Sequence, residues 1–178
     1  MVDVLRVRLS WANPALIDEE APLKSAGLSA DLIDSVELEN LANIYLWRYP
    51  DLNITILRPC NIVGPGVRNA ISTLLSGERA PVLAGFSPMM QFIHIDDMAD
   101  LYLFLLDQPD EAIDGKIYNA GYENHTLLEL AEIVKKVVGG DLEVDVEPTD
   151  DLRSYHVSSE KMRNELGFEP SHSIEDAV

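Results

Sequence analysis

Short runs rich in apolar and β-branched residues alternate along this chain with longer segments in which apolar residues recur at helical spacing. Asn53 to Leu57 (NITIL) is one such run, and it follows residues 29–49, whose apolar residues lie near helical spacing. This alternation is typical of an α/β protein. A turn-rich loop is expected next, at residues 58–66 (RPCNIVGPG). Further strands are predicted at residues 2–9, 81–85, 90–95, 115–121 and 141–147.

Capping residues indicate where the helices begin and end. Thr126 and Glu129 form a capping box, which predicts a helix that ends at Gly139. Asp96 or Asp97 is expected to cap a very apolar helix, because a carboxylate accepts hydrogen bonds from free backbone N–H groups. Other helices are predicted at residues 67–75, from Ser158 or Ser159 to Gly167, and from Ser173 onward.

The charge balance excludes several classes of partner. The chain holds 13 Lys and Arg against 31 Asp and Glu, which is a formal net charge of -18. Nucleic acids and anionic membranes bind basic surfaces, so neither is expected as a partner. No apolar run approaches the roughly 20 residues that a membrane span needs. Charged residues also interrupt the apolar start of the chain, so a signal peptide is not expected. The single cysteine fits a cytoplasmic location, which is the predicted one.

The cysteine and histidine residues limit the chemistry that can be expected. Cys60 is the only cysteine, so no disulfide can form within one chain. The histidines lack metal-ligand spacing, and no metal site is predicted. Cys60 has two readings, a reactive thiol or a buried small residue, and the second is favoured. For His94, packing beside a helix start is favoured over catalysis.

Several segments, in this order, carry a resemblance to a known family. ITILRPCNIVGPG is similar to a strand followed by L-R-x-x-N-x-x-G, and QFIHIDDMADLYLFLL is similar to D-[FY]-I-H-V-x-D-[LV]-A. GKIYNAGYENHTLLELAEIV and YHVSSEKMRNELGFEP match two later segments. Together they resemble the extended short-chain dehydrogenase/reductase family, specifically its NAD-dependent nucleotide-sugar epimerases and dehydratases of the UDP-glucose 4-epimerase type.

The resemblance implies an α/β fold that corresponds to the C-terminal part of a family member. The last strands of a Rossmann-type parallel sheet would be joined to a small α/β substrate-binding domain. Residues 1–66, with strand 115–121 returning to them, would be the remnant of the Rossmann-like domain, and residues 67–178 mainly the substrate domain. Complete members bind NAD or NADP at a Gly-rich turn, G-x-x-G-x-x-G. This chain lacks that motif, so cofactor binding by the chain alone is not expected.

The resemblance also assigns binding residues. Pro59 and Cys60 fall where the backbone of family members passes the nicotinamide of the cofactor. Asn61, Asn69 and Tyr155 fall at positions that contact a sugar-nucleotide substrate, so the implied partner is a small ligand of that kind.

Other positions depart from the family pattern. Two phosphate-binding arginines of the family correspond to Met90 and Pro148 here, which argues against tight nucleotide-sugar binding because arginine makes the strong bidentate contacts to phosphate. Counting back from Arg58 without gaps places Leu32 at the catalytic Tyr of the family's Y-x-x-x-K motif, and Val36 at its Lys. Neither side chain can transfer a proton, so no catalytic residue is assigned.

Two functions therefore stay open. The first is the substrate-binding part of an NAD-dependent nucleotide-sugar epimerase or dehydratase that is not catalytic as this chain alone. The second is a non-catalytic binding or assembly module that dimerises. Residues 29–49 correspond to a helix that packs between subunits in the family, and their apolar residues cover more than one face. A homodimer through this helix is expected.

Overall fold

Parallel pairing joins most of the strands in the computed structural model, which describes residues 2–3, 16–21, 33–69, 81–84, 89–139, 144–148 and 155–178. One parallel sheet has the strand order β1-β2-β6. It consists of β1 (Val2–Asp3), β2 (Ile56–Pro59) and β6 (Ile117–Ala120). In its register, Arg58 lies opposite Asn119 and Pro59 opposite Ala120, so β2 and β6 end at the same edge.

The remaining strands form two smaller sheets. In the order β3-β5-β7, β5 pairs in parallel with β3 and antiparallel with β7. These strands are β3 (Asn61–Val63), β5 (Met89–His94) and β7 (Glu123–Thr126). A parallel pair is formed by β4 (Pro81–Ala84) and β8 (Asp145–Pro148). The described helices are α1 (Ile33–Arg48), α3 (Ile95–Leu106), α4 (Asp110–Ile113), α5 (Leu127–Val138), α6 (Glu160–Leu166) and the short 3-10 turn η3 (Glu175–Ala177).

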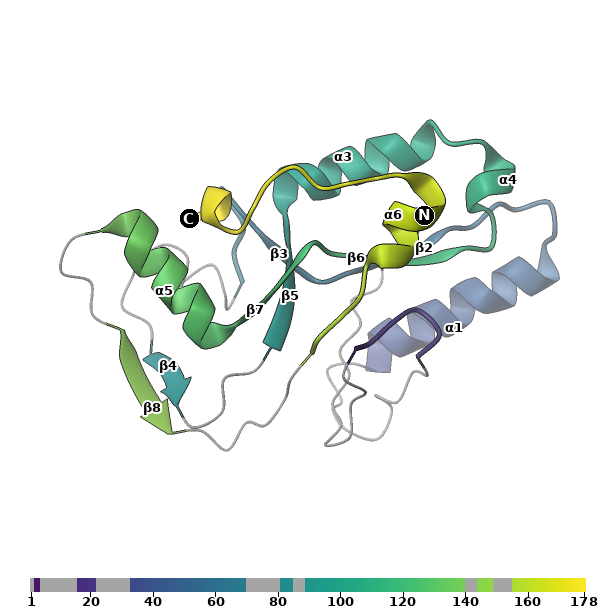
Figure 1. Ribbon diagram of the computed structural model, residues 1–178. Helices are drawn as coiled ribbons and strands as arrows, with labels where there is room; N and C mark the ends of the chain where they lie inside the picture. Colours follow the sequence, from purple (N-terminus) through teal and green to yellow (C-terminus); the bar gives the residue numbers. More distant parts are fainter. Residues whose placement is uncertain are drawn as a thin grey trace.

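Helices cover both faces of β2. Ile56 packs in a cluster with Ala42 of α1, and the next residue, Leu57, packs with Leu101 of α3 and Met162 of α6. Successive side chains of a strand point to opposite faces, so α1 lies on one side of the strand and α3 with α6 on the other (Figure 1). All residues of β2 are buried, as expected for a strand inside a doubly covered parallel sheet. The predicted α/β class with a Rossmann-like sheet is confirmed.

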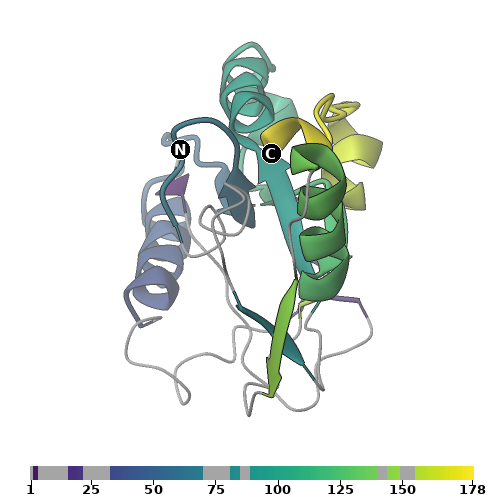
Figure 2. The ribbon, with the colours of Figure 1, turned by 90° about the vertical axis from the view of Figure 1, so that its left-hand side faces the viewer.

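A second cluster joins α5 and the C-terminal turn to the mixed sheet. Val63 of β3 and Phe92 of β5 pack against Leu130 and Val134 of α5, and Ile174 completes this cluster. Figure 2 shows α5 lying alongside β5, with the C-terminal segment close to the end of the helix. The C-terminal segment therefore contributes to the core, and Ile174 is 3% exposed.

Most of the predicted elements are confirmed where the structure describes them. The strands expected at 81–85, 90–95 and 115–121 correspond to β4, β5 and β6, and the helix expected from Ser158 or Ser159 corresponds to α6. The capping box at Thr126 and Glu129 is present with both of its reciprocal hydrogen bonds. Ser173 donates to the side chain of Asp176 at 2.7 Å, at the start of η3.

The strand predicted at residues 53–57 has different bounds in the structure. β2 begins at Ile56 rather than at residue 53, because Ile54 and Thr55 bond to the α4 region instead of to a neighbouring strand. The Ile54 N–H donates to the Asp114 carboxylate at 3.0 Å, and the Thr55 hydroxyl donates to the carbonyl of Ile113 at 2.8 Å. Residues 61–63, predicted as loop, form β3 because they pair with β5.

Two further elements were not predicted, and several expectations lie outside the described residues. α4 is one short helical turn, and β7 (ENHT) has no apolar alternation; it is a strand because its backbone pairs with β5. β8 begins at residue 145, inside the range predicted from 141. Residues 67–69 are not helical, and 70–75 lie outside the described part of the chain, as do residues 4–9, 29–32 and 141–143.

Candidate functional site

The common edge at which β2 and β6 end carries a small pocket of about 30 Å³. Ligands of open parallel sheets bind outside the carboxyl ends of the strands. The pocket is lined by Ile17, Arg58, Pro59, Cys60, Asn119, Tyr155 and Val157. Both strands contribute to it, and a hydrogen bond of 3.1 Å from the Cys60 N–H to the carbonyl of Ala120 holds their ends together.

The structure brings together Pro59, Cys60 and Tyr155, which the sequence had assigned to the cofactor and substrate sides of one site. All of them line the pocket. Asn61 and Asn69 are not among its lining residues. The Asn61 side chain donates to the Gln91 carbonyl at 3.1 Å and joins β3 to β5, and that of Asn69 donates to the Ile62 carbonyl at 2.8 Å.

A buried ion pair lies beneath the pocket. Arg58, 5% exposed, directs its guanidinium at the carboxylate of Glu39 on α1, which is 1% exposed. Nε of Arg58 donates to Oε2 of Glu39 at 3.0 Å, and Nη2 donates to Oε1, so the contact is bidentate. Nη1 donates to the backbone carbonyl of Glu19 at 2.9 Å. The end of β2 is thereby tied to α1 and to residues 16–21.

Glu19 and Asn119 connect the remaining walls of the pocket. Oε1 of Glu19 accepts a hydrogen bond of 2.8 Å from the backbone N–H of Asn119 on β6. The side chain of Asn119 donates in turn to the carbonyl of Ser158 at 2.9 Å. Ile17 pairs with the same segment, since its N–H donates to the His156 carbonyl at 2.8 Å. Glu19 and Glu39 were missed in the sequence, because neither lies in a motif and their partners are distant in the chain.

The thiol of Cys60 is not activated as a nucleophile. Burial raises the pKa of the Cys60 thiol well above its usual range, and a hydrogen bond to the backbone offsets this only in part. The thiol therefore stays protonated at neutral pH, whereas a reactive cysteine needs thiolate character. Cys60 is half-buried, and its protonated thiol argues against the reading of Cys60 as a reactive thiol.

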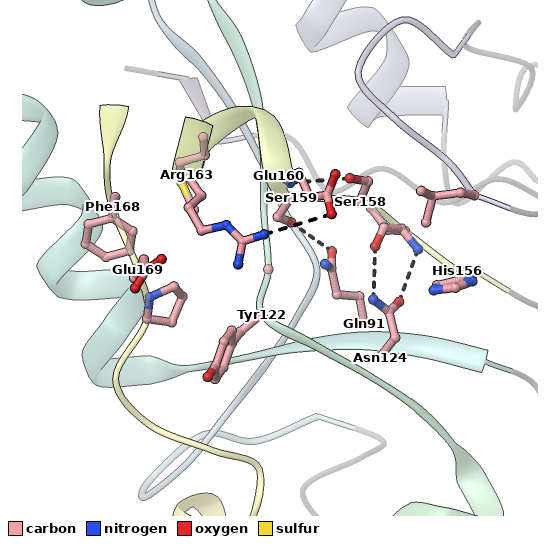
Figure 3. Close-up of a pocket in the computed structure, with 15 residues that line it drawn as sticks. Gln91, Tyr122, Asn124, His156, Ser158, Ser159, Glu160, Arg163, Phe168 and Glu169 are labelled. Atoms are coloured by element: carbon pink, nitrogen blue, oxygen red, sulfur yellow. Dashed lines mark hydrogen bonds and ion pairs between the residues drawn. The ribbon is translucent and has the colours of Figure 1, made fainter. Parts of the chain in front are cut away.

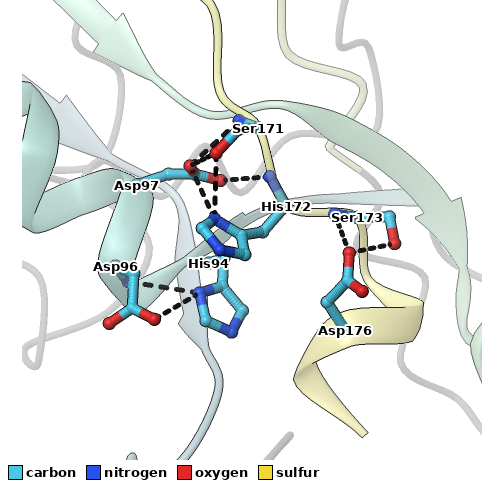
Figure 4. Close-up of polar contacts among 7 residues, drawn as sticks. All are labelled: His94, Asp96, Asp97, Ser171, His172, Ser173 and Asp176. Carbon is cyan, nitrogen blue, oxygen red and sulfur yellow. Dashed lines mark hydrogen bonds and ion pairs between the residues drawn. The ribbon is translucent and has the colours of Figure 1, made fainter.

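A separate polar cluster surrounds the start of α3 (Figure 4). His94 is 4% exposed, and its Nδ1 accepts a hydrogen bond of 3.2 Å from the backbone N–H of Asp96. His94 is therefore the N-cap of α3, and the prediction that Asp96 or Asp97 would cap this helix is wrong. The reason is that the helix begins one residue earlier, at Ile95, which places both aspartates inside its first turn. The expectation that His94 is packed and hydrogen-bonded beside a helix start is confirmed.

Asp97 holds the C-terminal segment. Its buried carboxylate accepts hydrogen bonds of 2.9 Å from the Ser171 N–H, 3.0 Å from the Ser171 hydroxyl and 2.9 Å from the His172 N–H. Burial would raise the pKa of Asp97, but these bonds and that from the His172 side chain outweigh it, so its pKa is lowered. The hydrogen bond to Asp97 in turn raises the pKa of His172.

The same cluster places potential metal ligands near one another. His94, Asp96 and His172 can each offer one ligand atom within 4.8 Å of the others. The imidazole rings of His94 and His172 are stacked, with centroids 4.6 Å apart and planes 21° apart. Nitrogen lone pairs lie in the ring plane, so nearly parallel rings direct them side by side rather than toward one ion. The contacts fit a structural role, and the absence of a metal site stays a prediction.

Met90 and Pro148 stand where the family has phosphate-binding arginines, and Met90 packs against a core cluster. Met90 on β5 is half-buried and packs against the cluster of β3, β5 and α5. Pro148 ends β8, opposite Ala84 in the register. Among the described residues, no helix is both long enough and apolar enough to cross a bilayer.

The sheet and the site at its carboxyl edge define an α/β protein of the Rossmann-like class. Residues 36–121 match the family described as NAD dependent epimerase/dehydratase family. The matched segment contains β2, β3, β5 and β6 with the pocket residues Arg58, Pro59, Cys60 and Asn119.

Curated relatives match part of the chain. The chain is 37% identical over 94 residues to "Putative GDP-L-fucose synthase 2" from Arabidopsis thaliana, a match that covers 52% of this chain and 28% of the relative. It is 29% identical over 113 residues to "UDP-glucose 4-epimerase" from Corynebacterium glutamicum, which covers 59% of this chain and 34% of the relative. The chain thus spans well under half the length of these curated relatives.

A solved structure shares the fold over almost the whole chain. The UDP-glucuronic acid 4-epimerase from Bacillus cereus, in complex with UDP-glucuronic acid and NAD, superposes with a TM-score of 0.81 at 18% identity. The alignment covers 98% of this chain and 57% of that protein. At this level of identity the likeness establishes the fold.

Proposed function

We propose that this chain is the substrate-binding part of an NAD-dependent nucleotide-sugar epimerase or dehydratase, and that it does not catalyse the reaction alone. One observation carries the proposal. Pro59, Cys60 and Tyr155, which the family pattern assigns to the cofactor and the substrate, line a single pocket where β2 and β6 end. Residues distant in sequence converge there, at the edge where open parallel sheets bind their ligands.

The domain organisation is part of the proposal. Residues 1–66, together with strand 115–121, would form the Rossmann-like part, and residues 67–178 mainly the substrate domain. The parallel sheet β1-β2-β6 supports the first part, since its described strands all lie within those ranges. β3 also lies in the first range but pairs with β5 of the second, so it would join the two parts.

The proposed contacts divide into those with the cofactor and those with the sugar-nucleotide substrate. The nicotinamide would pass Pro59 and Cys60, and the sugar would contact Tyr155, with Asn61 and Asn69 supporting the nucleotide side. Asn61 and Asn69 bond to backbone carbonyls, so their role would combine holding β3 with contacting the ligand. Val36 on α1 supplies no proton-transfer group at the position of the family's lysine. The single cysteine supports a cytoplasmic location.

The test is a titration of the full chain, observed by ¹H–¹⁵N NMR, with UDP-glucose and with NAD⁺ separately. We expect UDP-glucose to shift the amide signals of Cys60, Asn119 and Tyr155, and we expect no turnover to UDP-galactose. Tyr155→Ala should weaken the UDP-glucose response. Leu106→Ala is the control, because Leu106 lies on α3 and is 74% exposed. Unchanged signals at the pocket would refute ligand binding, and measurable epimerisation would refute the non-catalytic part.

A second function rests on the surface of α1. Large apolar side chains are exposed along this helix and just beyond it, namely Leu38, Leu41, Ile44, Tyr45, Trp47, Tyr49 and Leu52. Trp47 is 87% exposed. Several large apolar side chains exposed on one helix are typical of a protein interface. It supports a homodimer through this helix and, with it, the alternative of a non-catalytic assembly module.

A further inference from the structure

A larger cleft lies beside the small pocket, across the segment 155–159. The cleft has a volume of about 390 Å³, within the range of small-molecule sites. Tyr155 lines the small pocket, whereas His156, Ser158 and Ser159 line the cleft. Val157 lines both, so this segment forms a shared wall. The family pattern assigned Tyr155 but no residue of the cleft.

The floor of the cleft is apolar and closely packed. Met162 of α6 is 1% exposed and Phe168 is 9% exposed, and both line the cleft while belonging to the main core cluster. Gly121 is buried against the side chain of Gln91, where an added Cβ would lie 2.2 Å from Gln91 atoms. The absence of a side chain at Gly121 therefore allows Gln91 to pass along the base of the cleft.

Hydrogen bonds within the protein hold one wall of the cleft in place (Figure 3). The side-chain amide of Asn124 exchanges two bonds with the backbone of Val157, donating at 3.0 Å and accepting at 3.1 Å. The Ser159 hydroxyl bonds to Oε1 of Gln91 at 3.2 Å. These hydrogen-bonding groups already pair with one another within the protein. This wall of the cleft is therefore formed without a ligand.

The rim of the cleft carries the groups that remain open to a ligand. The Arg163 side chain is 53% exposed, and its ion-pair contact with Glu160 is long, at 3.9 Å. Glu160 and Glu169 supply carboxylate acceptors, and both are exposed. Tyr122 is 46% exposed and lines the cleft. Donors, acceptors and an aromatic face thus surround one apolar floor.

The charges on the rim select against anions. One arginine faces two glutamates, in a chain whose formal net charge is -18, so a phosphate or carboxylate would meet a locally acidic rim. A neutral sugar would satisfy the same groups: its hydroxyls donate to Glu160 and Glu169 and accept from Arg163, and the C–H face of the ring packs on Tyr122. We propose that this cleft binds a neutral saccharide unit, at a site separate from the small pocket.

The test uses neutral glycosides that carry no nucleotide. Methyl α-D-glucopyranoside and methyl α-D-galactopyranoside are titrated into the full chain and followed by ¹H–¹⁵N NMR. We expect shifts at Tyr122, Ser158, Arg163 and Glu169, with the amides of Cys60 and Asn119 unchanged. Arg163→Ala should weaken binding by about tenfold or more, because hydrogen bonds to a charged donor are lost.

Controls separate this proposal from the proposed function. Arg48→Ala removes an exposed arginine at the end of α1 and should leave the glycoside response unchanged. Saturable shifts with inorganic phosphate but none with the glycosides would overturn the neutral-saccharide assignment, and so would an Arg163→Ala protein that binds as tightly as the parent. The UDP-glucose titration reports on Cys60 and Asn119, so its failure would leave the glycoside result intact.

Discussion

Oδ1 of Asp97, in the first turn of α3, lies 2.9 Å from Nδ1 of His172, which follows it by 75 residues in the chain. A carboxylate accepts and does not donate, so Nδ1 of His172 carries the proton in this contact. The contact joins the C-terminal segment to α3, whose first turn is capped by His94. It makes the last residues of the chain part of the folded structure.

Replacement of Asp97 should destabilise the protein. Asp97→Asn removes the charge that accepts from Ser171 and His172, and hydrogen bonds to charged groups contribute about 1.5–3 kcal/mol each. We expect the free energy of unfolding to fall by about 2–4 kcal/mol, measured by urea denaturation. Asp96→Asn is the matched control: its side chain is 68% exposed, and its change should stay within about 0.5 kcal/mol. Equal effects of the two variants would contradict the role given to Asp97.

The Asp97–His172 contact predicts a dependence of stability on pH. Because the pKa of His172 is raised in the folded state, its contribution is fully present below the unfolded pKa of about 6.5 and is lost as the pH rises through the folded value. The pKa of Asp97 is lowered, so its contribution is present above about pH 3.9 and is lost as the pH falls through its folded value.

The difference in unfolding free energy between the parent and His172→Asn should shrink from about pH 5 to pH 9. A difference that grows with pH would reverse the sign and refute the assignment; His156→Asn is the control.

Replacing Arg58 in its buried ion pair with Glu39 should lower the free energy of unfolding. Arg58→Met leaves the Glu39 carboxylate buried without its partner, and breaking a buried pair costs about 3–5 kcal/mol. The double variant Arg58→Met with Glu39→Leu should regain much of that loss, because it leaves no unpaired charge. A double-mutant cycle by chemical denaturation measures the coupling. Lys136→Met breaks the exposed pair with Glu175 and should cost at most about 1 kcal/mol.

The exposed face of α1 predicts self-association. Light scattering after size-exclusion chromatography should give the mass of a dimer, and Ile44→Glu, at a position 55% exposed, should shift the protein to a monomer without loss of stability. Leu106→Glu is the control, since Leu106 is 74% exposed on α3, away from this face. A monomeric parent protein would exclude the homodimer and leave the α1 face for a different chain.

Local signals were sufficient for several elements. The capping box of Thr126 and Glu129 and the end of α6 at Gly167 depend on residues within a few positions of one another, and both are confirmed. β6 was predicted from its own apolar run. The polar strand β7 and the cap by His94 were not predicted, because pairing with β5 and the position at which β5 passes into α3 decide them.

In the candidate site, too, some residues were marked by local sequence signals and others only by tertiary contacts. Its residue types at Pro59, Cys60 and Tyr155 came from motif positions, but Glu19 and Glu39 had no motif to mark them. Each bonds to a partner far along the chain: Asn119 and the carboxylate of Glu19 are 100 residues apart.

The sequence by itself determined the α/β class, the family resemblance and most helix ends, because hydrophobic periodicity and capping act between neighbouring residues. Only the tertiary structure decided which polar groups meet. The buried Arg58–Glu39 pair, the Asp97–His172 contact and the cleft around Arg163 all form between separate elements. Burial then changes the chemistry of Arg58, Glu39 and Asp97, since a charge withdrawn from water must find its partner within the fold.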